Sequence, residues 1–185
     1  MNPVPYALAG SLLLRDAAAL LDSELAAELA ATEAQLLALR PDVPLSLPAP
    51  HDLRRSYWEV TRDLLPQVAL HVMERSTVIV DSAGIDTAQT NLRVYVVVGE
   101  GDLGSINESG YSDAMFAYLG AISGLLQRRL PRVACHTSAV HEVRERRLAW
   151  EPAVDTLTKT WIQRGRLDVT VFQSVTFDHP PEITP

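Results

Sequence analysis

Two stretches of the chain repeat apolar residues with the spacing of an α-helix. From Leu12 to Arg40 and from Tyr111 to Leu130, apolar residues recur every three or four positions, and polar residues fill the other faces. Pro41 follows the first stretch and Pro131 the second, and proline cannot continue a helix. Residues able to cap the start of the second stretch are Ser109, Ser112 and Asp113. We therefore predict two long amphipathic helices.

Four other segments have the period of two that is typical of β-strands. Segments 67–81 and 90–100 are rich in β-branched residues, and the turn-forming sequence SAGIDTAQ (82–89) separates them, which predicts a hairpin. Segment 138–152 reads as a strand and 159–177 as one long strand or a pair, which predicts a second hairpin. Paired strands separated by helices favour an α+β domain, with the helices on one face of a mostly antiparallel sheet.

The alternation also predicts which side chains share a face. In segment 90–100 one face carries Leu92, Val94, Val96 and Val98, and the other carries Arg93 and Tyr95. In the last strand, the apolar set is Leu167, Val169, Val171, Val175 and Phe177, and the alternating polar set is Asp168, Thr170, Ser174 and Thr176, with Phe172 on the outer side.

The length suits a single domain, 1–185. We divide it into an N-terminal helix (1–40), a Pro-rich connector (41–66), an α+β core (67–177) and a C-terminal tail (178–185). The end of the connector, 51–66, reads as a helical turn with Tyr57 and Trp58 facing inward.

Composition and charge narrow the function classes. The net charge of −7 predicts that the molecule as a whole repels nucleic acid. One cysteine, Cys135, excludes an internal disulfide. The apolar run from Tyr6 to Leu14 is too short to cross a bilayer and follows no basic region, so we expect a soluble, cytoplasmically made protein without a membrane partner.

Gly99, Gly101 and Gly104 match the spacing G-x-G-x-x-G of a dinucleotide-binding turn. The same loop carries Glu100 and Asp102, whose charges oppose a phosphate. The predicted helix starts too late, and the preceding strand belongs to an antiparallel hairpin rather than a parallel βαβ unit. We therefore interpret the segment as a mobile acidic loop and expect no nucleotide cofactor.

Cys135, His136, His141 and Glu142 lie close together in sequence, which invites a metal site or a Cys–His nucleophile. On a strand, the two histidines have opposite parity and face opposite sides of the sheet. The spacing also lacks the close ligand pairs typical of zinc sites. We expect no metal and no catalytic residue here; a small metal- or cysteine-dependent enzyme is the weakest alternative.

The run HEVRERR (141–147) places charges on both faces of a predicted strand. It fits a solvated edge strand protected against aggregation, and equally a subunit interface in which alternating charges set the register. Trp150 and Trp161 are interpreted as core packing, and His71 as a satisfied, partly buried histidine.

The order of elements resembles the tail terminator (tail-completion) proteins of long-tailed bacteriophages. The similarity covers about 66–177 and rests on LPQVALHVMERSTVIVD, TNLRVYVVVGEGD, YSDAMFAYLGAISGLLQRRL and WIQRGRLDVTVFQSVTF. It implies a structural virion protein rather than an enzyme. Such a protein forms a ring, commonly a hexamer, in the tail or neck of a virion assembled in the host cytoplasm.

The resemblance also implies partners and an interface. The ring caps the tail tube protein, ends its polymerisation, and meets the head-tail connector protein, while genome DNA passes through the lumen without specific binding. We expect the loop 99–110 to dock on the tube or connector. The candidate interface residues are Gly99, Glu100, Gly101, Asp102, Glu142, Arg144, Glu145 and Arg146. A head-completion or other neck connector protein is the alternative of the same structural class.

Overall fold

The computed structural model describes residues 3–42, 45–54, 65–80, 86–99, 108–154 and 161–177. Within these residues it contains two helices and a mixed sheet of six strands. In chain order the elements are β1 (Val4–Pro5), α1 (Tyr6–Leu39), β2 (Asp52–Arg54), β3 (Gln67–Val80), β4 (Asp86–Gly99), α2 (Glu108–Val133), β5 (Val140–Val154) and β6 (Trp161–Thr176).

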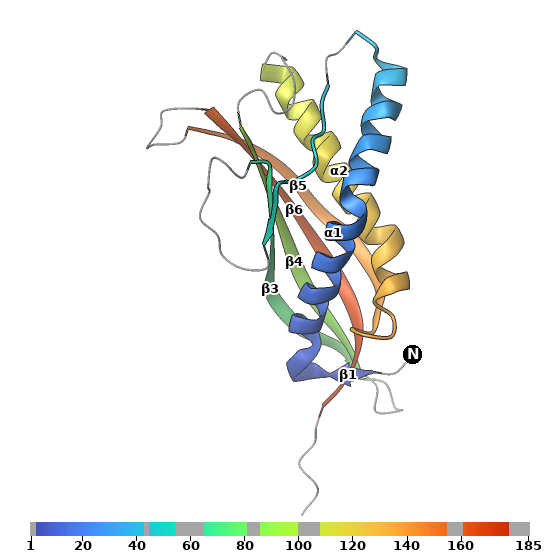
Figure 1. Cartoon of the computed structure of the whole chain (residues 1–185). Coiled ribbons are helices and arrows are strands. Elements are labelled where there is room, and N and C mark those ends of the chain that lie inside the picture. Colours follow the sequence, from blue (N-terminus) through green and yellow to red (C-terminus); the bar gives the residue numbers. More distant parts are fainter. Residues whose placement is uncertain are drawn as a thin grey trace, which may run out of the picture.

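The sheet is built around β6, which pairs antiparallel with β4 on one side and with β5 on the other (Figure 1). β4 continues antiparallel to β3, so both predicted hairpins, β3–β4 and β5–β6, are confirmed. Two short strands pair in parallel, β1 with the end of β6 and β2 with the start of β3. The α+β class is therefore confirmed, but the sheet is mixed rather than purely antiparallel.

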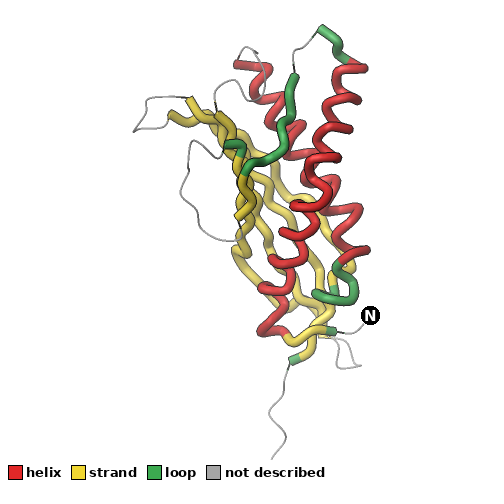
Figure 2. The backbone as a smooth tube through the Cα atoms, viewed as in Figure 1, coloured by secondary structure: helices red, strands yellow, loops and turns green. Residues whose placement is uncertain are grey.

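Both helices lie on the same face of the sheet, as Figure 2 shows. The strand residues that face them are apolar and buried, among them Val68, Leu70, Leu92, Val94, Val96, Leu167, Val169 and Val171. Helix residues that pack on them include Leu21, Leu25, Met115, Leu119 and Ile122. Because each fully buried aliphatic side chain stabilises the fold by about 1.5–3 kcal/mol, this single interface supplies most of the apolar stabilisation.

Gly165 lets α2 approach β6 closely. A Cβ atom at this position would lie 2.5 Å from the Sδ atom of Met115 and 3.1 Å from the side chain of Leu119. Both side chains are completely buried, so neither has free space to move into. The strand therefore has glycine at the point where the helix lies on it.

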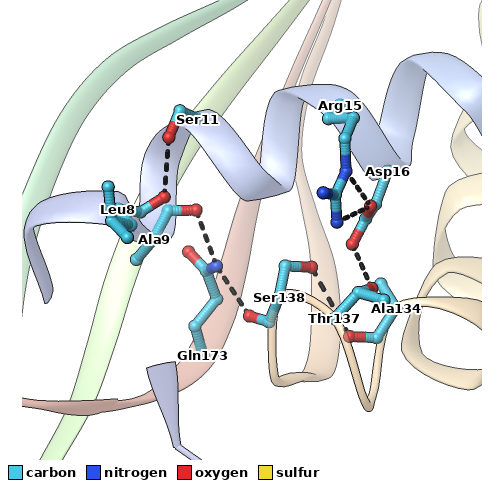
Figure 3. A network of polar contacts seen from close by, with 9 residues as sticks. All are labelled: Leu8, Ala9, Ser11, Arg15, Asp16, Ala134, Thr137, Ser138 and Gln173. Atoms are coloured by element: carbon cyan, nitrogen blue, oxygen red, sulfur yellow. Dashed lines mark hydrogen bonds and ion pairs between the residues drawn. The ribbon is translucent and has the colours of Figure 1, made fainter. Parts of the chain in front are cut away.

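A buried glutamine joins three segments that are far apart in the sequence (Figure 3). The Nε2 atom of Gln173, in β6, donates to the carbonyl oxygen of Ala9 at 3.0 Å and to that of Ser138 at 2.9 Å. Its Oε1 atom accepts from the hydroxyl of Thr90 at 2.9 Å. These bonds fix the first turn of α1 and the turn before β5 onto the sheet.

Several predicted boundaries were wrong. α1 begins at Tyr6 rather than Leu12, because its first turns are apolar nearly all round and lack the amphipathic spacing used to find it. β4 begins at Asp86, so 86–89 of the predicted eight-residue turn belong to the strand, where they pair with both β3 and β6. Asp52–Arg54 forms a strand rather than a helical turn, and Tyr57 and Trp58 lie outside the described residues.

The second helix also extends beyond its predicted ends. It starts at Glu108, so the proposed caps Ser109, Ser112 and Asp113 lie inside it. It continues past Pro131 to Val133. A proline this close to the end removes one backbone donor, and the next turn is still closed by the amide of Ala134 donating to Leu130. Neither helix has the length and apolar character needed to span a membrane.

We expect Gly165→Ala to lower the free energy of unfolding by about 1–3 kcal/mol, because the new methyl group overpacks the contact with α2. Chemical unfolding in urea measures this change. Gly120→Ala is the matched control, since nothing lies within 4 Å of a Cβ atom there, and alanine should stabilise the helix by about 0.5–1 kcal/mol. Equal effects of the two substitutions would contradict the close approach at Gly165.

Candidate functional site: the open face of the sheet

The face of the sheet turned away from α1 and α2 is covered by no other element in the part of the chain that the structure describes. We call it the open face. Its side chains come from the alternate positions of four strands, β3, β4, β5 and β6. They are mainly polar, and they include His71, Glu74, Asn91, Arg93, Tyr95, Arg144, Arg147, Arg166, Asp168, Thr170 and Phe172.

An ion pair between β4 and β6 lies at the centre of the open face. The guanidinium of Arg93 donates to both carboxylate oxygens of Asp168, with Nε–Oδ1 at 2.6 Å and Nη2–Oδ2 at 3.3 Å. The two side chains are 22% and 19% exposed, so the pair is largely shielded from water. The hydrogen bond to Asp168 is the main reason that the pKa of Arg93 is raised above its ordinary value.

Arg166 also contacts this carboxylate. Its Nε atom lies 3.3 Å from Oδ2 of Asp168, close enough for ion pairing but not aligned for a hydrogen bond. Asp168 therefore neutralises parts of two guanidinium groups, and the cluster keeps a net positive charge.

His71 and Tyr95 continue the cluster toward β3. Their rings meet edge to face with centroids 5.6 Å apart, and Arg93 donates to the Tyr95 hydroxyl at 3.3 Å. The partial burial predicted for His71 is confirmed, but its Nε2 atom has no hydrogen-bond partner among the described residues, contrary to the prediction of a satisfied histidine. Burial, and then the charge of Arg93, lower the pKa of His71 from 6.5.

The edge strand β5 contributes a second group of charges. Arg144 donates to Glu142 and lies over the ring of Phe172, 4.9 Å from its centroid. The hydrogen bond from Arg144 is the main cause of the lowered pKa of Glu142. Among the described strands β5 pairs with β6 alone, so the predicted edge strand is confirmed.

Two β-bulges flank the central ion pair from opposite sides. The register of β3 slips between Val72 and Glu74, and that of β5 slips between Glu145 and Arg147. The extra residues are Met73 and Arg146, and bulges of this kind redirect side chains. Between them lies a hollow of about 560 Å³, which we call the double-bulge hollow. It is lined by Met73, Glu74, Asn91, Leu92, Arg93, Arg146, Arg147, Arg166 and Asp168.

The predicted interface residues fall into three groups. Glu142, Arg144 and Arg146 lie on the open face, where Arg146 donates to Oδ1 of Asn91 at 3.1 Å. Glu145 points to the helix side instead and accepts a hydrogen bond from Ser123 of α2, which separates it from the other three. Gly99 is the last residue of β4; Glu100, Gly101 and Asp102 lie outside the described residues.

The other candidate chemistry is not assembled in the described residues. Cys135 and His136 lie in the turn before β5, so the parity argument, which placed His136 on a strand, was wrong. No group of three metal-ligating side chains occurs in the described parts of the chain.

β4 is antiparallel to both neighbours and α2 begins at Glu108, which argues against a dinucleotide site at Gly99, Gly101 and Gly104. Trp150 packs against the core and donates to Gln163 at 2.7 Å, as expected.

We expect Asp168→Ala to reduce the free energy of unfolding by about 1–3 kcal/mol, because it leaves the shielded guanidinium of Arg93 without its carboxylate partner. Replacing both partners, with Arg93→Met and Asp168→Leu, should recover most of the loss. Glu142→Ala, which removes the exposed acceptor of Arg144, should have no measurable effect in the same urea titration. If Asp168→Ala were equally silent, the central ion pair would not support the sheet.

His71 gives the stability of the protein a pH dependence of known sign. Because the pKa of His71 is lowered in the folded state, the unfolded chain binds a proton near pH 6.5, whereas the folded chain binds it only at a lower pH. Stability should therefore fall as the pH drops from about 8 to about 5, and His71→Gln should fall less steeply. Urea unfolding of both proteins across this range measures the difference; parallel curves would exclude His71 as the source.

Comparison of the sequence with known protein families and with curated proteins finds no match in either.

Proposed function

We propose that this chain is a structural protein of a phage tail, a tail terminator whose copies form a ring. The ring caps the tail tube, stops its polymerisation and presents a surface to the head-tail connector. The proposal starts from the similarity in the order of elements between 66 and 177. It gains its main physical support from the open face.

The open face is the observation that carries the proposal. An antiparallel sheet commonly packs one face on the core and leaves the other accessible, and such an accessible face is available to a partner. Here that face combines arginines with carboxylates and is hollowed between two bulges. It adjoins an edge strand, β5, that has one strand partner among the described residues. Closed rings are built from head-to-tail contacts between two different surfaces of identical copies, and this face suits one of the two.

The charge of the open face also sets how it must be oriented in such a ring. Its arginines would attract DNA phosphates, whereas the chain as a whole is acidic. The proposal therefore directs the open face toward a neighbouring copy and leaves more acidic surfaces to line the lumen, so that the genome passes without binding.

Purified chain added to polymerising tail tube subunits should limit the length of the tubes, and electron micrographs measure the length distribution. We expect one annulus at one end of each tube. Heat-unfolded chain and an unrelated acidic protein of similar size are the controls. Tubes of unchanged, indefinite length would contradict the proposal, and binding to a connector without any effect on tubes would favour a neck protein instead.

A further inference from the structure

The double-bulge hollow contains more positive than negative charge. Four arginines line it, Arg93, Arg146, Arg147 and Arg166, against the carboxylates of Glu74 and Asp168. Asp168 is already occupied by Arg93 and contacts Arg166. The charges of Arg146 and Arg147 are therefore the ones left to attract a ligand.

The bulge in β5 brings these two arginines to the same hollow. In a regular strand, consecutive residues face opposite sides of the sheet. The slip between Glu145 and Arg147 lets both Arg146 and Arg147 line the hollow. Arg146 uses one of its N–H groups to donate to Asn91. Arg147 is exposed and has no ion pair in the described residues. Several guanidinium donors remain available there, and a guanidinium matches a carboxylate with two parallel hydrogen bonds.

The opposite wall suits a protein side chain. It is formed by Met73, which is 52% exposed, and its neighbour Glu74. Methionine is unbranched and adapts to the shape of a partner, so it can pack against the apolar stem of a glutamate or aspartate.

We propose that the double-bulge hollow is a binding site for a carboxylate side chain of a second copy of this chain. The identity of the partner rests on the proposed ring. The carboxylate pairs with Arg146 and Arg147, its stem packs against Met73, and the central Arg93–Asp168 pair forms a rigid floor.

The fixed carboxylates on this face favour a single acidic side chain over nucleic acid. Glu74 stands in the wall of the hollow, and Glu142 lies further along the same face on β5. A phosphodiester chain carries a charge on every residue, so its neighbouring phosphates would meet these carboxylates. A single carboxylate pairs with Arg146 and Arg147 on the side of the hollow opposite Glu74 and brings only one like charge near it.

A second copy offers the complementary charge. The chain has a net charge of −7, although the hollow is positive, so the residues outside the hollow together carry a net negative charge. On the helix layer, Asp22 of α1 and Asp113 of α2 are exposed. A contact between the open face of one copy and an acidic surface of the next joins unlike surfaces, which is the arrangement that closes into a ring.

The test compares self-association of the full chain with that of R146Q/R147Q by sedimentation velocity, alone and with tube subunits, at low and high salt. We expect the double variant to associate at least about tenfold more weakly and to lose most of its salt dependence. R132Q is the control: it removes one exposed arginine near the end of α2 that makes no ion pair among the described residues. It should associate like the wild type.

A second measurement locates the contact directly. Modification by the arginine reagent phenylglyoxal, read by mass spectrometry, should be suppressed at Arg147 in the assembled protein but not at Arg132 near the end of α2. The proposal is overturned if R146Q/R147Q associates like the wild type, if Arg147 stays reactive, or if the wild type remains monomeric even with tubes. Tight binding of a DNA duplex that R146Q/R147Q abolishes would assign the hollow to phosphate instead.

These outcomes are separate from the tube-length assay. A wild type that shortens tubes while R146Q/R147Q assembles normally leaves the proposed function standing and removes the carboxylate site. A wild type that self-associates through Arg147 without affecting tubes keeps the site and removes the tail function.

Discussion

The strict alternation of side chains along β4 and β6 is the constraint on which the rest of this structure depends. β6 pairs with β4 along the whole of β4, so alternate positions of the two strands form a buried, mainly apolar face, and the remaining positions form a mainly polar face. Burying the apolar face requires cover, and α1 and α2 supply it, with α2 resting on Gly165. Because successive residues of a strand face opposite sides of the sheet, the same pairing of β4 with β6 brings Arg93, Arg166 and Asp168 together on the other side.

Much of the fold, and Glu142, Arg144 and Arg146 of the open face, could be predicted from local patterns, whereas the central ion pair and the double-bulge hollow could not. The faces of β4 follow directly from Leu92, Arg93 and their neighbours, because a period of two is a local property. The contact between Arg93 and Asp168 depends on the pairing of two strands that are not adjacent in the sequence, and no local signal gives its register. The bulge at Arg146 was equally hidden, because a single extra residue changes the facing of HEVRERR without changing its composition.

The distribution of charge matters more here than its sum. A net charge of −7 suggests a surface that repels anions everywhere, yet the arginines of β4, β5 and β6 gather on one face. Sequence reasoning from the total alone therefore describes the average surface and misses the local field. Segregated charge of this kind gives identical molecules two unlike surfaces, which is what ordered head-to-tail contacts require and what uniform repulsion would prevent.

The bonds of Gln173 have a consequence for how the chain reaches this fold. The pairing of Val4 with Val175, and the bond from Gln173 to Ala9 across 164 positions, join the start of the described chain to its last strand. During synthesis β1 and the first turn of α1 therefore have no docking surface until β6 has left the ribosome. Contacts of such long range slow folding, since the chain must close a large loop before they form. The protein should thus acquire its fold late and nearly all at once, and a chain truncated before β6 would expose the apolar side of β4 to aggregation.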